Sequence, residues 1–324
     1  MGCSNSSKNK NKNIKSFNKY KNIATVERYE PKLKNDYGTV CFLELENDQF
    51  LVSTQNNKII IYNNKDFTVS FVIRLTSSVN TIVKIKNEEE YIYIFGDDIG
   101  KVHILGLDYN KNYKIFNSFD CESTVTKILK HNKELIVSSY KEILFFDIKK
   151  NKLEKTKTYN DHLSIADIFN IYIIDNLLLS FAYDNKNGNV NQIIIHNLLN
   201  DEIVYKESAA SVIPWNNSVC KLSPNLLVIA GNKSEIRIFD INTFKTIAQL
   251  FDLDIFYSIV CLKNKIFCGG DSGKIYEFEY NFDKNELKAK DQIQIHKSSI
   301  FSINVTSSGT IVTTSRDGTI KFFE

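Results

Sequence analysis

Methionine, tryptophan, proline and long apolar runs are scarce in this sequence. Its 324 residues include one methionine, one tryptophan and three prolines. The most apolar stretch, residues 165–183, is interrupted by Asp and Asn and is too polar for a transmembrane helix. Residues 1–20 lack the apolar core of a secretory signal peptide. Sustained apolar spacing of three and four residues is also missing, which argues against helical repeats.

The cysteines show no pattern typical of metal binding. No Cys-x-x-Cys pair with a nearby histidine indicates a zinc site. In predicted strands, a free cysteine usually packs as a small apolar side chain. Five cysteines follow the N-terminal segment, and most fall in such strands: Cys41, Cys121, Cys220, Cys261 and Cys268. This usage is typical of a reducing compartment, and we expect neither a metal nor a cofactor.

Net charge is small and unevenly distributed. The whole chain carries +3. Residues 1–36 contain nine Lys or Arg and three Asp or Glu, which gives +6 and leaves −3 for residues 37–324. The larger part of the chain is therefore not the basic surface that nucleic-acid binding requires, and nucleic acid is not an expected partner.

Seven short apolar strands recur along the chain. They are residues 58–62, 101–105, 142–146, 192–196, 235–239, 274–278 and 319–323. Their last residues are spaced by 43, 41, 50, 43, 39 and 45. The last strand follows Asp317-Gly318, and Asp-Gly between strand formers is a strong hairpin signal. A period near forty, with room for four short strands in each unit, is typical of a β-propeller.

At these strands the chain resembles the WD-repeat β-propeller family, in which the third strand of a blade ends in Trp-Asp. Four blades have a related pair: Phe146-Asp147, Phe239-Asp240, Phe278-Glu279 and Phe323-Glu324. The other three have Tyr62-Asn63, Leu105-Gly106 and His196-Asn197. The resemblance covers about residues 23–324 and implies an all-β fold. That fold is a seven-bladed propeller of four-stranded antiparallel blades.

The resemblance also implies that the two ends of the propeller meet. The last blade ends at Glu324 without a fourth strand, whereas residues 23–29 alternate like a strand and have no partner in the first blade. The family closes its ring with such an N-terminal strand. We therefore divide the chain into a tail, residues 1–22, and a propeller, residues 23–324. The alternative, a loose N-terminal arm, leaves a strand edge exposed.

A buried polar network is expected in the last blade. In the family, a histidine before the first strand shares its proton with a second-strand hydroxyl and a turn aspartate. The matching residues are His296, Thr313 and Asp317. Phe323 stands at the tryptophan position and has no N–H group, so the network should end at Thr313. Such a network stabilises a blade, and no nucleophile or metal-ligand set beside it indicates catalysis.

Blade four has two further candidate features. The spacing of His162 and Asp184 predicts a weaker copy of the histidine network. The connection at residues 208–218 contains Pro214 and Trp215, and it should share a face with the Asn-rich turn at residues 183–191. Trp215 either anchors a partner there or folds back to plug the channel mouth.

The N-terminal residues have the pattern of an acylated, basic membrane tail. Met-Gly-x-x-x-Ser places Gly2 at the acceptor position for myristate, and the adjacent Cys3 suits palmitoylation. A lysine series follows: Lys8, Lys10, Lys12, Lys15, Lys19 and Lys21. The alternative is a polar tail in which this pattern arose by chance.

These features favour a non-catalytic protein-interaction scaffold that lipidation tethers to the cytoplasmic face of a membrane. Its expected partners are proteins at the propeller loops and membrane lipid at the tail. The chain itself is expected to be a monomer or a subunit of a hetero-complex. One alternative is a soluble WD-repeat subunit of a larger cytoplasmic or nuclear assembly. Another is a catalytic propeller, but the sequence shows no convergent carboxylates or Ser/His/Asp set.

Overall fold

The fold was analysed in a computed structural model. It describes residues 21–26, 38–46, 48–87, 90–107, 112–149, 152–162, 166–183, 191–208, 214–215, 217–231, 233–251 and 253–324. Within these ranges the chain forms 28 β-strands. No helix in the described residues is long and apolar enough to cross a membrane.

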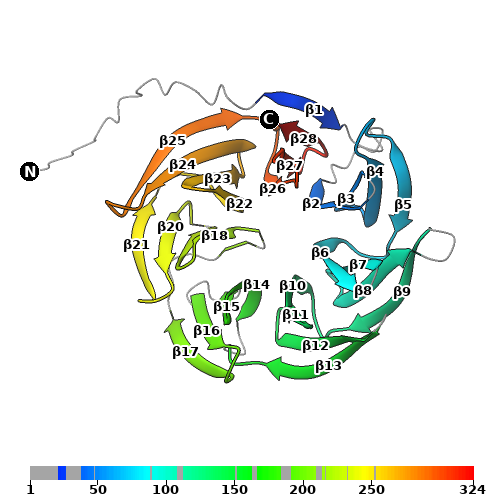
Figure 1. Cartoon of the computed structure of the whole chain (residues 1–324), viewed down its shortest axis with the longest axis horizontal. Helices are drawn as coiled ribbons and strands as arrows, with labels where there is room; N and C mark the ends of the chain where they lie inside the picture. The colour runs from blue at the N-terminus through cyan, green and yellow to red at the C-terminus, as the bar shows by residue number, and fades with distance from the viewer. Residues whose placement is uncertain are drawn as a thin grey trace, which may run out of the picture.

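The strands form seven four-stranded antiparallel sheets arranged as blades around a centre (Figure 1). Blade one contains β2 (Thr39–Glu44), β3 (Gln49–Thr54), β4 (Lys58–Asn63) and β5 (Val69–Arg74). Blade two contains β6 (Val79–Asn87), β7 (Glu90–Asp97), β8 (Lys101–Leu107) and β9 (Tyr113–Asp120). Blade three contains β10 (Val125–His131), β11 (Glu134–Ser139), β12 (Ile143–Lys149) and β13 (Lys152–Tyr159). The predicted seven-bladed, all-β propeller is confirmed.

The remaining blades repeat this order. Blade four contains β14 (Asp167–Ile174), β15 (Leu177–Tyr183), β16 (Asn191–Asn197) and β17 (Glu202–Ser208). Blade five contains β18 (Val219–Ser223), β19 (Leu226–Ala230), β20 (Ile236–Asp240) and β21 (Lys245–Leu250). Blade six contains β22 (Phe256–Leu262), β23 (Lys265–Gly270), β24 (Lys274–Asn281) and β25 (Glu286–Gln294). Blade seven contains β26 (Ile300–Val305), β27 (Ile311–Ser315), β28 (Ile320–Phe323) and β1 (Asn22–Val26).

Blade seven closes the ring by pairing the two ends of the described chain. β1 runs antiparallel to β28, with Asn22 opposite Phe323 and Val26 opposite Ile320. The backbones of Lys21 and Glu324 extend this ladder through N···O distances of 2.7 and 3.1 Å. The predicted closing strand is therefore confirmed for residues 23–26, and the strand begins one residue earlier, at Asn22. Residues 27–29 and the tail up to residue 20 lie outside the described residues, so the boundary between tail and propeller stays a prediction.

Apolar side chains pack mainly between neighbouring blades. The third strands are nearly covered along their length because side chains on both of their faces meet an adjacent blade. At the position where the family has tryptophan, four blades bury Phe146, Phe239, Phe278 and Phe323. A phenylalanine therefore fills this packing position without the indole N–H. In six of the blades a register shift occurs just before or at this position, between the third and fourth strands.

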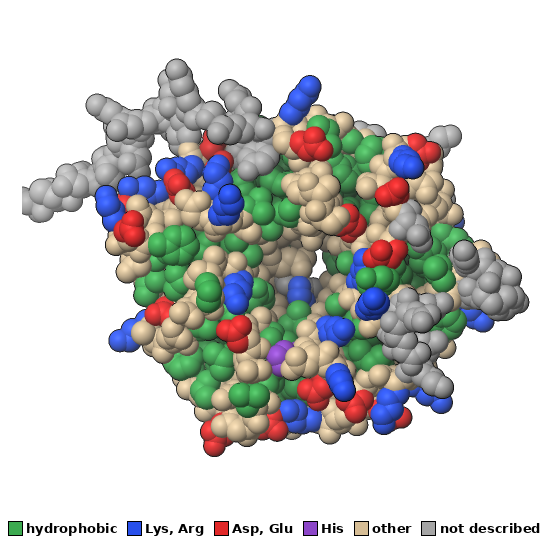
Figure 2. Space-filling model, in the orientation of Figure 1, with side chains coloured by type: hydrophobic (Ala, Val, Ile, Leu, Met, Phe, Trp, Pro, Cys, Tyr) green, Lys and Arg blue, Asp and Glu red, His purple; other side chains and the backbone are tan. Residues whose placement is uncertain are grey.

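These register shifts help to explain the shape of the ring. A β-bulge increases the local right-handed twist of a strand pair. In Figure 1 the fourth strands run along the rim, while the first strands surround the centre. The space-filling view shows an opening at the centre and side chains of both charge signs interspersed around it (Figure 2).

Candidate partner-binding site at the channel mouth

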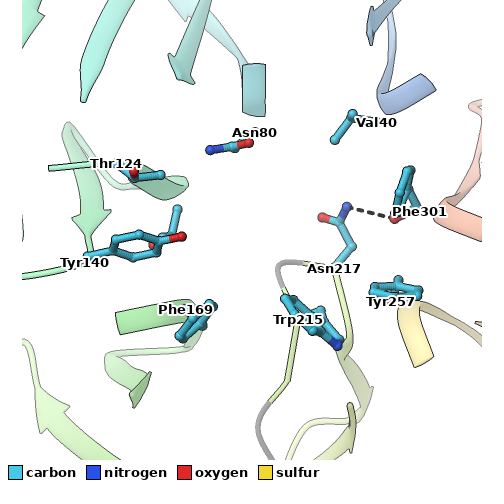
Figure 3. A pocket seen from close by; sticks show the side chains of 10 residues that line it. Val40, Asn80, Thr124, Tyr140, Phe169, Trp215, Asn217, Tyr257 and Phe301 are labelled. Atoms are coloured by element: carbon cyan, nitrogen blue, oxygen red, sulfur yellow. Dashed lines mark hydrogen bonds between the residues drawn. The ribbon is translucent and has the colours of Figure 1, made fainter. Parts of the chain in front are cut away.

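A cavity of about 230 Å³ lies where the innermost strands begin (Figure 3). Its lining comes from six blades and from the connection between blades four and five. The lining residues are Val40, Asn80, Thr124, Thr126, Tyr140, Phe169, Trp215, Asn217, Tyr257 and Phe301. Since the innermost strands surround the central channel, this cavity forms one mouth of that channel.

Five aromatic rings follow one another around this cavity, and we call them the aromatic arc. In order they are Tyr140, Phe169, Trp215, Tyr257 and Phe301. The centroids of successive rings are 5.5, 6.0, 5.4 and 5.6 Å apart. Two of the four contacts are edge-to-face, with interplanar angles of 86° and 79°. These separations and angles are typical of favourable aromatic pairs.

Hydrogen bonds to its backbone hold Trp215 in this arc. Its carbonyl oxygen accepts from Asn170 Nδ2 at 2.7 Å and from Ser218 N and Oγ at 3.0 and 2.9 Å. The indole is half-buried, and its Nε1 is covered without a hydrogen-bond partner among the described residues. Trp215 both packs between two rings and lines the cavity. The sequence left open whether Trp215 anchors a partner or plugs the channel mouth, and its position has features of both.

Asn217 contributes a polar side chain to the cavity, and two hydrogen bonds hold this side chain in place. Its Oδ1 accepts from Lys127 Nζ at 2.9 Å, and its Nδ2 donates to the Phe301 carbonyl at 3.4 Å. Burial lowers the pKa of Lys127 to about 8. Asn80 lies across the cavity and donates to the Val125 carbonyl at 3.1 Å. The two amides are thus held by the scaffold before any partner arrives.

Two tyrosine hydroxyls belong to the arc. Burial, followed by the charge of Asp271, raises the pKa of Tyr257 to about 12. The Tyr257 hydroxyl donates to Asp271 Oδ1 at 3.2 Å. Burial also raises the pKa of Tyr140. Both hydroxyls therefore remain protonated at neutral pH, and the single proton of Tyr257 is donated to Asp271.

The structure brings the predicted residues of the blade-seven network together. His296 Nε2 lies 2.8 Å from Thr313 Oγ1, and its Nδ1 lies 3.2 Å from Asp317 Oδ2. The imidazole is fully covered. Burial opposes ionisation of Asp317, but hydrogen bonds from His296 and Thr319 outweigh it and hold the pKa of this carboxyl well below its usual range. The network is a structural one in the interior of the blade.

Thr319 is a member of this network that the sequence analysis missed. Its hydroxyl lies 2.9 Å from His296 Nδ1 and donates to Asp317 Oδ1 at 2.7 Å. Its position could have predicted this role, because Thr319 lies two residues after Asp317 and a hydroxyl at that spacing readily hydrogen-bonds to an aspartate side chain. The family pattern continues this network to the tryptophan position, here Phe323, and so it does not predict a role for Thr319.

The described partners of the blade-four histidine are an amide and a hydroxyl. His162 Nδ1 lies 2.9 Å from Gln192 Oε1, and its Nε2 lies 2.8 Å from Ser180 Oγ. Asp184 lies outside the described residues. Burial lowers the pKa of His162 to about 4, so the ring is neutral at pH 7. The predicted contact between His162 and Asp184 therefore stays a prediction.

Other predicted sites are only partly covered by the structure. Gly2, Cys3, Lys8, Lys10, Lys12, Lys15 and Lys19 lie outside the described residues. Lys21 is exposed beside the C-terminal residue. Within the described part of the chain, no group of three or more His, Cys, Asp or Glu side chains is placed to hold a metal ion.

The geometry defines a seven-bladed β-propeller, and comparison with solved structures agrees. A chain in the crystal structure of the mitotic checkpoint complex aligns with a TM-score of 0.75 and 14% identity, covering 100% of this chain and 96% of that one. The WD40 β-propeller domain of Doa1 aligns with a TM-score of 0.70 and 15% identity, over 94% and 97% of the two chains.

The structure of U3-55K also aligns, with a TM-score of 0.70 and 11% identity, over 90% of this chain and 96% of that chain. No family model and no curated protein matches the sequence. Because the identities are low, the likeness is one of fold.

Proposed function

We propose that this chain is a non-catalytic scaffold that binds another protein at the channel mouth. The observation that supports this most directly is the aromatic arc. Partly exposed aromatic rings beside fixed hydrogen-bonding groups are the usual composition of energetically important interface residues. Here five such rings and two held amides, Asn80 and Asn217, line a single cavity. The solved chain from the mitotic checkpoint complex, which this chain resembles in fold, is part of that complex.

We further propose that the tail tethers this scaffold to the cytoplasmic face of a membrane. The Met-Gly-Cys-x-x-Ser sequence and its lysine series support acylation at Gly2 and Cys3. The ring offers a suitable attachment point, because β1 lies on the outer rim of blade seven (Figure 1). The aromatic arc lies at the centre. Anchor and partner would therefore use different parts of the propeller.

Affinity capture followed by mass spectrometry tests the binding proposal. The full-length protein and a Tyr140→Ala variant are used as baits. Tyr140 lies in the turn between β11 and β12, so its truncation should disturb the blade less than a change within a strand. Loss of a central interface aromatic costs about 2 kcal/mol or more, a factor of roughly thirty in affinity. Proteins that bind at the arc should therefore disappear from the variant's captured set.

A matched control substitutes an exposed apolar residue away from the cavity. Leu199, in the turn between β16 and β17, is 76% exposed. Leu199→Ala should retain every partner, and both variants should melt close to the wild type. If Tyr140→Ala and Trp215→Ala both fold normally and capture the same proteins as the wild type, the arc is not the binding site.

A further inference from the structure

Cys220 and Cys261 lie side by side on the innermost strands of blades five and six. Asn217 and Ser258 form a parallel bridge between these two segments, and Ile259 N donates to the Asn217 carbonyl at 2.8 Å. Cys220 and Cys261 each follow their bridge residue by three positions, on neighbouring inner strands. Both side chains pack against the same apolar cluster between the two blades.

Cys261 is the neighbour that most affects the ionisation of Cys220, whose Sγ also lies 3.6 Å from the Lys221 carbonyl oxygen. The Cys261 thiol and its backbone N–H both favour the thiolate of Cys220, and together they outweigh burial, so the pKa of Cys220 lies below the ordinary thiol value. The hydrogen bond to Cys220, followed by burial, raises the pKa of Cys261 well above that value. The two shifts are opposite in direction, so loss of one proton from the pair favours the thiolate at Cys220.

The other described cysteines lack this arrangement. Burial raises the pKa of Cys41 and Cys268, and it raises the pKa of Cys121 to about 12. Cys268 belongs to the same cluster but is completely covered, whereas Cys220 and Cys261 are half-buried. Oxidation of cysteine follows thiolate character and exposure, so this pair is the favoured target within the described residues.

We propose that Cys220 and Cys261 form a reversible disulfide that links blades five and six when the protein meets a peroxide. The parallel bridge at Asn217 and Ser258 holds the two segments at about 4.8 Å, the spacing of paired strands, three residues before the cysteines, and disulfides accept Cα separations of roughly 4.4–6.8 Å. In a reducing compartment such a link is transient, as expected for a redox-responsive site.

The reaction balances with hydrogen peroxide as the oxidant. The Cys220 thiolate attacks one peroxide oxygen, the O–O bond breaks, and Cys220 becomes a sulfenic acid while hydroxide leaves and is protonated to water. The sulfur of Cys261 then attacks the Cys220 sulfur, the S–O bond breaks, and a second water leaves with the proton from the Cys261 thiol. Two thiols lose two electrons and peroxide gains them. A thiol reductant reverses the link.

Peptide mapping tests this proposal, because trypsin places each cysteine in a separate peptide. Cys220 falls in residues 207–221, Cys261 in residues 246–263 and Cys268 in residues 266–274. The full-length protein is treated with hydrogen peroxide, its remaining thiols are alkylated under denaturing conditions, and it is digested without reductant. We expect loss of the alkylated 207–221 and 246–263 peptides and the appearance of one linked species. That species should disappear after treatment with dithiothreitol.

Three variants separate the roles of these cysteines. Cys261→Ser should leave a sulfenic acid on Cys220 that dimedone labels, whereas Cys220→Ser should prevent both the link and the label. Cys268→Ser is the matched control from the same cluster and should still form the link. The wild-type map does not depend on any variant folding. If peroxide leaves both peptides unlinked while oxidising other cysteines, or links Cys261 to Cys268 instead, the proposal is wrong.

Discussion

Val26, on the first strand of the chain, lies directly opposite Ile320, on its last strand. Both side chains are buried in a cluster that also contains Phe322 of blade seven and Phe50 of blade one. The rings of Phe50 and Phe322 are 5.5 Å apart. Closure of the propeller is therefore a packing contact between blades as well as a backbone ladder.

This contact predicts that stability depends on one face of β1. Val26→Ala should lower the free energy of unfolding by about 2 kcal/mol, because two buried methyl groups are lost and a small cavity remains. Ile23 is on the same strand but is 48% exposed, so Ile23→Ala should have a much smaller effect. Urea unfolding of the two variants measures the difference. Equal losses would mean that β1 is not packed as described.

Truncation gives a second test of closure. Deleting residues 1–20 should leave the melting temperature nearly unchanged, whereas deleting residues 1–26 should lower it sharply. The longer deletion exposes the edge of β28 and uncovers Phe322. Thermal unfolding at equal protein concentration provides the comparison. Similar melting temperatures for the two deletions would contradict a stabilising role for β1.

Asp317 should make a pH-dependent contribution to stability. Its folded pKa is lower than its unfolded pKa, so its contribution is fully present above about pH 4, the ordinary aspartate range, and is lost as pH falls through the folded pKa. Asp317→Asn should therefore cost about 2 kcal/mol at pH 7 and less at pH 3. Urea unfolding at both pH values measures this. Asp283→Asn, an exposed carboxylate in the turn after β24, is the control and should be nearly neutral at both.

His162 should also make stability fall with pH, because its folded pKa lies below its unfolded pKa as well. Burial holds the folded pKa near 4, whereas an unfolded histidine titrates near 6.5. Between these values the unfolded chain binds more protons than the folded one. The folded state should thus lose stability as pH falls from about 6.5 to 4, by on the order of 3 kcal/mol from this residue. His162→Gln should flatten that part of the stability profile. A variant with the wild-type slope would show that His162 does not supply it.

The repeat and the aromatic arc differ in how far the sequence could predict them. The third strands were identifiable because each is a short apolar run at a regular spacing, and the pairing of their neighbours then follows from chain order. His296, Thr313 and Asp317 fall within one blade, where local spacing predicts contact. The rings of the arc come from separate blades and connections. Apart from Trp215, which its loop next to Pro214 made a candidate, each has the local pattern of an ordinary strand or turn residue, and the closed ring brings them together.

The same limit applies to the two cysteines of the blade-five and blade-six junction. Cys220 and Cys261 each have the sequence context of a small buried side chain, which is how the sequence analysis interpreted them. Their contact depends on a local parallel bridge between the inner strands of adjacent blades. The chain-order pairing of a propeller contains only antiparallel ladders within blades, so it does not predict that bridge.

Myristate, palmitate and the lysines of the tail should contribute different free energies to membrane binding. One myristoyl chain gives a membrane partition constant of about 10⁴ M⁻¹, which is only marginal attachment. Palmitate on Cys3 would add ~0.8 kcal/mol for each buried methylene, enough for long residence. Each lysine near an anionic leaflet contributes up to ~1 kcal/mol. The lysine contribution alone is screened by salt, over about 8 Å at physiological ionic strength.

Gly2→Ala should therefore abolish recovery of the protein with membranes, because the first acyl group is lost and with it the encounter that allows Cys3 to be palmitoylated. Cys3→Ser should leave weak binding that high salt removes, because myristate then acts only with the lysines. Fractionation of both variants at low and high salt measures these outcomes, and metabolic labelling with myristate checks the acylation itself. Replacing exposed Lys21 alone is the matched control and should change recovery little, since it removes one of six lysines. If Gly2→Ala remains on membranes like the wild type, the proposed anchor is wrong, while the channel-mouth proposal is unaffected.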